Sequence, residues 1–498
     1  MGDSSAKLTA EGATVSKMDK RRGIAVYQDA CSGQPGRARN QMPYLLKEFF
    51  LLRGWERLPY ALVDIRRGST SFLNDSAFQA LSFCDGAFDT SCPILFPVHR
   101  QVMGELLKNG IIEESQGRTR LQEQQKYRLY PCRYIRRAHW AITGKCNYRC
   151  RHCYLSAPES KYGELSHEQC LDVIRQLSEA GIFTVSLTGG EALVRPDFLE
   201  IVDALLERSI SISQIYSNGA LINEQLLDEL DKRGVRPEFS ISFDGIGYHD
   251  WIRGVTGAEQ KALDAFRLLH RRGFPIGVEM TLNKPNLHTL GATIQLLADH
   301  GVRSVKTSPT TGAGNWLNEQ GRYDLGAEEL YNAYLDYLQK YRAAGAPVSI
   351  MLGGFFACRK GTDQFQIPCK RYDGSDGMLR QTVCASARTT MYIGADGRLL
   401  PCVPLTGSGL EEQMPSITEM PLVQALSDSR YLRAIDTRLD ELLDRNEKCR
   451  VCEHRLTCGG GCRAGALFTS GEFLGCDEYT CRFFKDNYEE RIKAIYAS

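Results

Sequence analysis

Three cysteines stand within eight residues of this chain, in the loop Gly144–Tyr154. Cys146, Cys150 and Cys153 are spaced C-x3-C-x2-C, so three thiolates can converge from one loop onto a single metal centre. A four-iron cluster takes four such ligands, and three from the protein would leave one iron open to a cofactor. A zinc knuckle or three unrelated thiols are the alternatives. The spacing favours an iron–sulfur cluster.

A second array of cysteines occupies the C-terminal part of the chain. Cys384 is followed after twelve residues by Gly397 and then by Cys402, and a second run of cysteines extends from Cys449 to Cys476. That run reads Cys449-x2-Cys452-x5-Cys458-x3-Cys462, then Cys476. In a long chain, C-x2-C spacing indicates metal binding more than disulfides. Two zinc ribbons remain the alternative to iron–sulfur clusters.

The totals narrow the class of protein further. The 498 residues carry a formal net charge of +1, which argues against nucleic-acid binding through the overall field of the molecule. There is no run of eighteen apolar residues and no signal-peptide pattern, so a cytoplasmic, multidomain enzyme without a membrane partner is expected. The 18 cysteines predict that it is rich in metal.

The middle of the chain alternates between strand and helix patterns. Apolar strands are predicted at residues 138–143, 184–187, 212–216, 239–243, 276–282 and 303–307, with helical segments between them. Six strands that alternate with helices predict an α/β fold built on a parallel sheet. Polar motifs follow several of these strands, and the carboxyl ends of parallel strands are the usual place for chemistry.

The cysteine loop and Thr188-Gly-Gly-Glu191, which follows the second strand, together resemble the radical S-adenosylmethionine (SAM) superfamily. The resemblance implies a partial (β/α)6 barrel over residues 137–350. It also implies that Cys146, Cys150 and Cys153 hold a [4Fe–4S] cluster, whose open iron is chelated by the amine and carboxylate of SAM. The family usually has an aromatic residue just before the third cysteine, and His152 holds that place here.

The resemblance also implies contacts to SAM. Thr188, Gly189, Gly190 and Glu191 are expected to grip the amino group of SAM, since glycines allow close backbone approach and a carboxylate can hold an ammonium. Other candidates, which follow the third and fourth strands, are Ser217, Ser242 and Arg253. Ser242 and Arg253 resemble the family's contacts to the sulfonium carboxylate and ribose, although each could equally be a loop residue. Asp244, His249 and Asp250 are polar groups expected to line the SAM cavity, and no residue is assigned a catalytic proton transfer from the sequence.

The C-terminal array matches the seven-cysteine pattern of the SPASM domain, which is expected over residues 351–498. By that resemblance Cys449, Cys452, Cys458 and Cys476 hold one auxiliary [4Fe–4S] cluster. Cys384, Cys402 and Cys462 contribute to a second cluster that lacks a fourth ligand. Cys358, Cys369 and Cys481 are the candidates for that ligand, and an iron open to the substrate is the other possibility.

The N-terminal part of the chain is expected to hold a separate module. Residues 1–42 are polar and aperiodic, and they predict a disordered extension. Residues 43–120 predict a winged-helix-like α+β unit with a hairpin and two short helices. Eight acidic residues against five Lys or Arg between Trp55 and Glu114 argue against DNA. The unit resembles the PqqD-like recognition element that binds a leader peptide as an added strand; a structural cap is the alternative.

Taken together, these resemblances imply a radical SAM/SPASM maturase of ribosomally synthesised peptides. Its expected partners are a precursor peptide and an electron donor such as flavodoxin or ferredoxin, and its expected product is an intrapeptide crosslink, with a thioether favoured. Enzymatic alternatives are a carbon–carbon or carbon–oxygen crosslink, epimerisation, formylglycine formation on a sulfatase, and maturation of a peptide-derived redox cofactor or quinohaemoprotein. A zinc-stabilised peptide-binding scaffold is the alternative without catalysis.

Overall fold

The computed structural model describes residues 42–116, 119–159, 161–384 and 386–497. The chain divides into two compact units. One unit ends at Tyr134 and includes Glu179–Phe183, and the other holds Ile135–Ser178 and the chain from Thr184 onward. The extension predicted over residues 1–42 lies outside the described residues, except for its last position.

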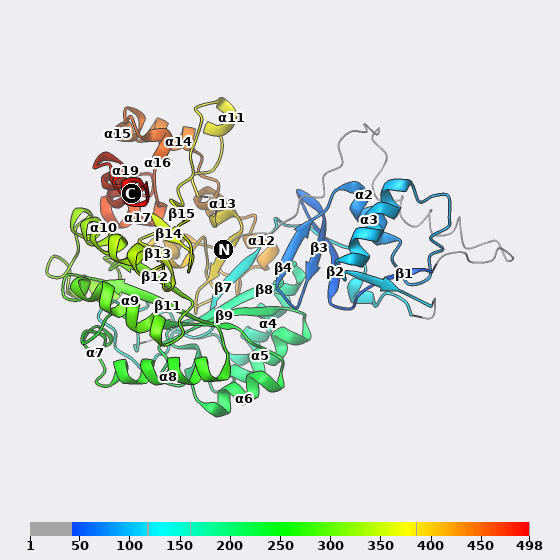
Figure 1. Ribbon diagram of the computed structural model, residues 1–498, viewed down its shortest axis with the longest axis horizontal. Helices are drawn as coiled ribbons and strands as arrows, with labels where there is room; N and C mark the ends of the chain where they lie inside the picture. The colour runs from blue at the N-terminus through cyan, green and yellow to red at the C-terminus, as the bar shows by residue number, and fades with distance from the viewer. Residues whose placement is uncertain (1–41, 117–118, 160, 385, 498) are drawn as a thin grey trace. The chain divides into compact units, whose positions relative to one another are not determined.

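The first unit is an α+β module (Figure 1). Its sheet has the strand order β4-β3-β2-β6, and β1 and β5 form a separate antiparallel pair. The elements are β1 (Tyr44–Leu46), β2 (Phe50–Trp55), β3 (Leu58–Asp64), β4 (Ser69–Phe72), α2 (Asp75–Ser82), α3 (Pro97–Lys108), β5 (Ile112–Glu114) and β6 (Arg128–Tyr130). The predicted hairpin corresponds to β3 and β4, and β6 lies beyond the predicted end at residue 120.

The helices of this unit pack on its sheet through one apolar core. Leu52 and Leu62 from the sheet meet Leu81 from α2, and Met103 and Leu106 from α3. Burying each such side chain stabilises the fold by about 1.5–3 kcal/mol. The Asn74 side chain caps α2 by accepting a hydrogen bond from the Ala77 N–H at 2.8 Å.

The second unit is built on an eleven-stranded sheet. Its order is β15-β14-β13-β12-β11-β10-β9-β8-β7-β16-β17, and β7 to β13 are neighbours that run parallel in chain order. The strands are β7 (Arg137–Ala141), β8 (Thr184–Thr188), β9 (Ser211–Ser217), β10 (Glu238–Ser242), β11 (Ile276–Leu282), β12 (Ser304–Pro309), β13 (Ser349–Leu352), β14 (Phe356–Cys358), β15 (Phe365–Gln366), β16 (Thr390–Ile393) and β17 (Leu399–Leu400). The six predicted strands correspond to β7–β12, so the α/β fold with a parallel sheet is confirmed.

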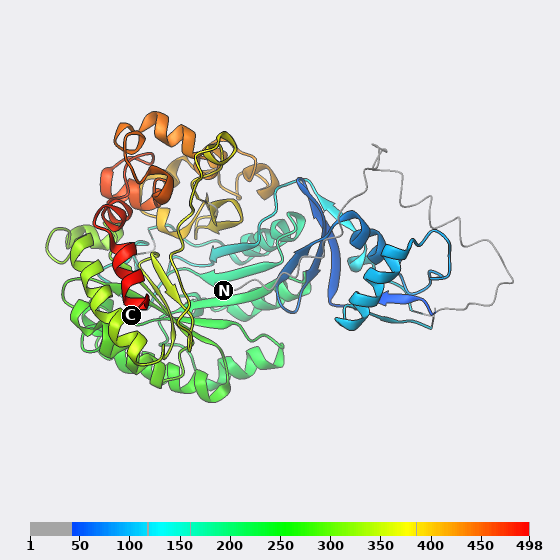
Figure 2. The ribbon, with the colours of Figure 1, turned by 45° about the horizontal axis from the view of Figure 1, so that its top comes forward.

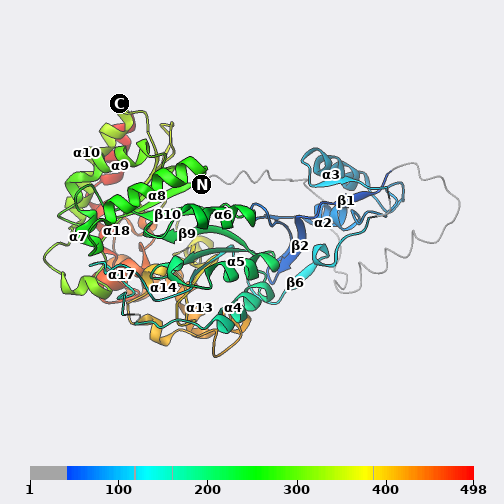
Figure 3. The same ribbon diagram turned by 90° about the horizontal axis from the view of Figure 1, so that it is seen from below.

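Helices connect these parallel strands and lie around the outside of the curved sheet (Figures 2 and 3). They are α4 (His167–Glu179), α5 (Phe198–Glu207), α6 (Glu224–Lys232), α7 (His249–Arg253), α8 (Ala258–Arg272), α9 (Leu290–Asp299) and α10 (Ala327–Ala343). Because helices connect these parallel strands, the carboxyl ends of β7–β12 all lie at one edge of the sheet. No helix among the residues described is long and apolar enough to cross a membrane.

The C-terminal segment joins the same sheet. Strand β16 pairs in parallel with β7, and β17 pairs antiparallel with β16. The predicted domain boundary at residue 350 falls inside β13. The remaining helices are short: α11 (Asp376–Leu379), α12 (Leu422–Ala425), α13 (Ser429–Ile435), α14 (Leu439–Arg445), α15 (Glu447–Arg450), α16 (Arg455–Cys458), α17 (Arg463–Ser470), α18 (Glu478–Lys485) and α19 (Tyr488–Ala497).

Candidate functional site

The three cysteines of the first motif lie in the loop that follows β7, at the carboxyl edge of the sheet. Each sulfur accepts a hydrogen bond from the surrounding protein. The Tyr148 N–H donates to Cys146 Sγ at 3.4 Å, the Ala157 N–H donates to Cys153 Sγ at 3.3 Å, and a guanidinium N–H of Arg253 donates to Cys150 Sγ at 3.8 Å. Donors at all three sulfurs favour the thiolate form, which is the form that binds metal.

The same sulfurs are close enough to affect one another. Burial raises the pKa of Cys146 to about 12, and the neighbouring charges of Cys150, Glu191 and Cys153 add to that rise, against the Tyr148 N–H. Burial also raises the pKa of Cys150 to about 11, which the Arg253 charge opposes. Three thiols that hinder each other's ionisation suit a cationic centre, which would hold all three as thiolates. This donor set therefore fits the cluster that the sequence predicts.

Gly189 and Gly190, which follow β8, allow the end of this strand to contact the start of the cysteine loop. The Gly190 N–H donates to the Thr143 carbonyl at 2.9 Å, and the Glu191 N–H donates to the Lys145 carbonyl at 2.9 Å. A Cβ at Gly189 would lie 2.3 Å from the Thr143 oxygen, and one at Gly190 would lie 2.2 Å from the Lys145 oxygen. Gly189 also has a φ of 145°. The pair is required here for close approach of two backbones, whatever it contributes to SAM.

Glu191 is fully buried and is held by donors of the protein itself. Its carboxylate accepts from the Asn218 N–H at 2.7 Å, the Ser217 hydroxyl at 3.1 Å and the Leu193 N–H at 3.2 Å. Burial raises its pKa to about 7, although these hydrogen bonds lower it. Glu191 thus links the end of β8, where Thr188 lies buried, to the end of β9. Contact of Glu191 with the amino group of SAM, and of Ser217 with SAM, stays a prediction.

Arg253 belongs to a buried ion pair beside the cysteine loop. Its Nε donates to Asp244 Oδ2 at 2.6 Å, and the Thr281 N–H donates to Asp244 Oδ1 at 2.9 Å. His249 Nδ1 lies 3.3 Å from Asp244 Oδ2, and both of these side chains are fully buried. The guanidinium is therefore fixed between a carboxylate and the Cys150 sulfur. The sequence indicated Asp244 only as a polar cavity residue and gave no signal for this pairing.

The remaining predicted residues have varied surroundings. His152 Nδ1 is buried without a hydrogen-bond partner in the described chain, and burial together with the Arg253 charge lowers the His152 pKa to about 4. Ser242 ends β10 in a half-buried position. The Asp250 carboxylate caps the start of α8 by accepting from the Gly257 and Glu259 N–H groups at 2.6 and 2.7 Å. Asn218, which the sequence did not single out, donates to the Asn147 side chain at 2.8 Å and reaches the sulfur of Cys146 at 4.0 Å.

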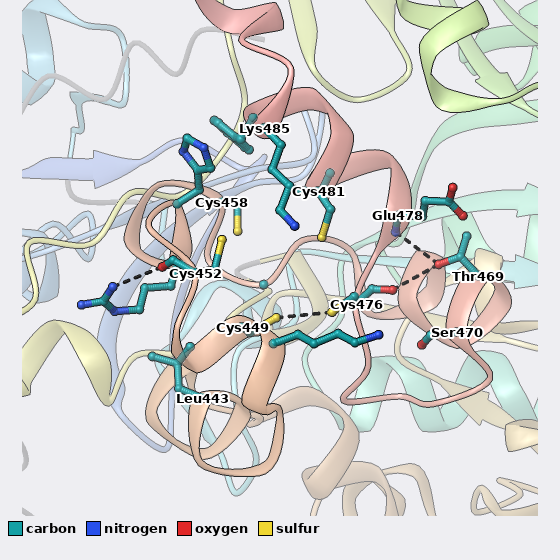
Figure 4. Close-up of a pocket in the computed structure, with 16 residues that line it drawn as sticks. Leu443, Cys449, Cys452, Cys458, Thr469, Ser470, Cys476, Glu478, Cys481 and Lys485 are labelled. Atoms are coloured by element: carbon teal, nitrogen blue, oxygen red, sulfur yellow. Dashed lines mark hydrogen bonds between the residues drawn. The ribbon is translucent and has the colours of Figure 1, made fainter.

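The C-terminal cysteines gather around a cavity of about 260 Å³ (Figure 4). Five of them line it: Cys449, Cys452, Cys458, Cys476 and Cys481. Four are the ligands that the sequence predicts for one cluster, and Cys481 is a fifth. No three His, Cys, Asp or Glu side chains in the described ranges are grouped to hold a single metal ion. A many-cysteine cavity of this size fits a polynuclear cluster.

A second group contains the other three predicted ligands. Burial raises the pKa of Cys402 well above its usual value, and the charges of Cys462 and Cys384 add to the rise. These three thiols are thus close enough for their charges to interact, and a cluster shared by them stays a prediction. Cys358 lies elsewhere in β14, where its S–H donates to the Thr362 carbonyl at 3.3 Å.

Comparison with known proteins identifies the family of this chain. The family model of the radical SAM superfamily matches residues 140–297. The pre-heme d1 synthase of Dinoroseobacter shibae is 31% identical over 67% of this chain and 83% of its own length. The chain belongs to the radical SAM superfamily. It is therefore an enzyme, and the family implies SAM and a [4Fe–4S] cluster.

Other relatives of this radical SAM enzyme carry two kinds of name. The AdoMet-dependent heme synthase of Methanosarcina barkeri is 26% identical over 68% of this chain and 94% of its own length. The sporulation killing factor maturation protein SkfB of Bacillus subtilis is 26% identical over 62% of this chain and 67% of its own. Streptococcus suis SuiB, solved with its precursor peptide SuiA, has a TM-score of 0.62 at 15% identity, covering 88% of this chain and 100% of that one.

Proposed function

We propose that this enzyme is a peptide maturase that acts on a ribosomally synthesised precursor and installs a crosslink within it. The observation that carries the proposal is the extent of the likeness to SuiB. It covers 88% of the chain, which is more than the second unit alone can supply. The fold likeness therefore reaches into the first unit, beyond the radical SAM core. SkfB, whose name describes a maturation protein, is a second peptide-type relative.

In this proposal the residues of the chain hold the cluster, orient its ligands and shield the site from water. When bound, SAM and its cluster would supply the radical chemistry that removes a hydrogen atom from an unactivated carbon of the peptide. Cys146, Cys150 and Cys153 would hold the cluster, and Arg253 would keep the Cys150 sulfur in place through its hydrogen bond. Glu191 and Asp244 are fully buried, so these two carboxylates are shielded from water. Flavodoxin or ferredoxin is the expected electron donor.

Two auxiliary [4Fe–4S] clusters complete the proposed cofactor set. One would take its ligands from the five-cysteine cavity, and the other would be held by Cys384, Cys402 and Cys462. Among the described residues, none of the three candidates for a fourth ligand is placed with the latter group. Cys358 is hydrogen-bonded to Thr362, and Cys481 lines the other cavity. The pKa of Cys369 is raised to about 11 by burial, and the thiol that adds to this rise is Cys458, which belongs to the first cavity.

An iron left open at the second cluster would accept a soft ligand from the substrate. A peptide thiolate is the natural one. It would be held close to the carbon that loses hydrogen, which favours a thioether over a carbon–carbon or carbon–oxygen bond. The test is mass spectrometry of a precursor co-expressed with the enzyme. We expect a loss of two hydrogens with cysteines that resist alkylation. The same loss with every cysteine alkylated would exclude the thioether, and an unchanged precursor mass would contradict the maturase.

The heme synthases among the relatives favour a second candidate, a tetrapyrrole substrate. The discriminating feature is the first unit, which a small tetrapyrrole does not need. Formylglycine formation and cofactor maturation remain enzymatic alternatives with peptide or protein substrates. A zinc-stabilised scaffold without catalysis is set aside, because the chain belongs to an enzyme superfamily. Conversion of a tetrapyrrole with no effect on any co-expressed peptide would favour the second candidate.

The first unit offers an edge strand where a leader peptide can add. In the described chain β4 pairs only with β3, and the Leu73 N–H donates to the Tyr60 carbonyl at 2.9 Å. Because backbone groups alternate along a strand, the Thr70 and Phe72 N–H groups point away from β3. Phe72 is 49% exposed. An extended peptide could pair with these free groups, which is the recognition we propose for the leader.

Thr70→Pro is therefore expected to weaken precursor binding by about tenfold or more, since it removes an outward donor without breaking the ladder to β3. Thr70→Ala keeps that N–H and serves as the matched control, with affinity close to wild type. Fluorescence anisotropy with a labelled leader measures both variants, and SAM binding should be the same in each. Equal leader affinity for the proline and alanine variants would return this unit to a structural role.

A further inference from the structure

The cavity in the C-terminal segment has one cysteine too many for a cubic cluster, which takes four thiolates. Cys449, Cys452 and Cys458 come from the neighbouring helices α15 and α16 and the turn that joins them. Cys476 precedes α18, and Cys481 lies within that helix. Figure 4 shows the sulfurs of all five around one space. The sequence pattern selects Cys476 as the fourth ligand, but the contacts of the two candidates differ.

Cys476 is held beside another ligand. Its Sγ lies 3.7 Å from Cys449 Sγ, and the Asn446 side-chain amide donates to it at 3.6 Å. The Asn446 amide also donates to the Leu474 carbonyl at 2.9 Å, and its oxygen accepts from the Cys449 N–H at 3.0 Å. Asn446 thus fixes both sulfurs next to each other. In a four-iron cluster, each cysteine sulfur binds a different iron and points outward from it. The sulfurs of two such ligands therefore lie farther apart than two sulfurs that share a hydrogen bond, as those of Cys449 and Cys476 do.

Cys481 is placed differently. No hydrogen bond engages its sulfur among the residues that the structure describes, and Figure 4 shows that sulfur facing the cavity. Lys485, one turn later on α18, also lines the cavity and points its ammonium group toward the cysteines, and Lys448 lines it as well. These cations suit a centre that carries the charge of four thiolates.

We propose that Cys481 supplies the fourth thiolate to the cluster in this cavity, together with Cys449, Cys452 and Cys458. Cys476 stays outside the ligand set as a hydrogen-bond partner of the Cys449 sulfur. Such contacts to ligand sulfurs tune the potential of a cluster. This inference rests on the proposed auxiliary clusters and decides which residues of this chain hold one of them.

The test compares Cys481→Ala with Cys476→Ala. Each substitution removes one sulfur atom from the lining of the same cavity, so the two variants are matched. Each full-length variant is purified anaerobically and its iron is counted against the wild type, for which roughly 12 irons per chain are expected. Electron paramagnetic resonance of the dithionite-reduced protein follows the clusters, and thermal melting reports the fold. We expect Cys481→Ala to lose about four irons and one cluster signal. Cys476→Ala should keep its iron and show only a shifted midpoint potential.

Three results would overturn the assignment: loss of iron from Cys476→Ala alone, from both variants, or from neither. Should Cys481→Ala not fold, the Cys476→Ala protein still decides, because iron loss there contradicts the proposal and full retention supports it. A wild-type protein with only about four irons would instead refute the auxiliary clusters themselves. The failure of this inference and the failure of the proposed function are thus separate outcomes.

Discussion

Replacing Cys146, Cys150 and Cys153 together with alanine is expected to reduce 5′-deoxyadenosine formation to the background rate. The three sulfurs lie in one loop and accept hydrogen bonds from Tyr148, Ala157 and Arg253, which would stabilise them as the thiolate ligands of a cluster. Without them no ligand remains for the first cluster. Chromatographic assay of 5′-deoxyadenosine with dithionite as reductant measures the loss.

The auxiliary iron provides the internal control for this triple variant. It should remain, at roughly eight irons per chain, because the C-terminal cysteines lie in other loops. Cys170→Ala is the matched thiol control. Cys170 is buried in α4, where its S–H donates to the Leu165 carbonyl at 3.9 Å, and its removal should leave the rate within about twofold of wild type. SAM cleavage near the wild-type rate in the triple variant would show that the loop is not the cluster site.

Asp244→Asn is expected to destabilise the second unit by about 3–5 kcal/mol, because it leaves the Arg253 guanidinium buried without its counter-charge. The Asp244 side chain is 0% exposed and that of Arg253 is 9% exposed. Chemical denaturation measures the change in the free energy of unfolding. Asp264→Asn, which removes the partner of Arg267 on the surface of α8, is the matched control and should change stability by less than about 1 kcal/mol.

The Asp244–Arg253 ion pair also predicts how the stability of the fold depends on pH. Burial alone would raise the pKa of Asp244, but the Arg253 charge and the His249 hydrogen bond hold it far below its ordinary value of 3.8. A depressed carboxyl pKa stabilises the fold above the unfolded-state value, and that stability is lost as the pH falls through acid. The wild type should therefore lose stability below about pH 4 more steeply than Asp244→Asn. Parallel pH profiles would contradict the ion pair.

The sequence predicted the sheet well because hydrophobic periodicity and turn residues are local signals. Strands β7–β12 lie close to where the pattern placed them. Strand β16 could not be predicted, because it is defined by its pairing with β7, more than 240 residues earlier in the chain. Residues brought together by folding carry no local signature of their partners.

The site shows the same division. Cysteine spacing predicted groups of cysteines that the structure brings together, since the spacing itself is the signal. The roles of individual polar residues depended on contacts that no spacing encodes: Asp250 caps a helix, Asp244 pairs with Arg253, and the glycines at 189 and 190 allow two backbones to meet. From the sequence, Cys481 could belong to either group of cysteines. The structure is needed to see that it lines the cavity with the group from Cys449 to Cys476.

The measurement that tests the central claim most directly is deuterium transfer from the precursor peptide to 5′-deoxyadenosine. A precursor deuterated at its carbon-bound hydrogens is incubated anaerobically with the enzyme, SAM and dithionite, and the nucleoside is analysed by mass spectrometry. We predict one deuterium in 5′-deoxyadenosine, in proportion to the peptide that loses two hydrogens. Modified peptide with no deuterium in the nucleoside, or SAM cleavage with no effect on the peptide, would contradict a radical SAM maturase of peptides.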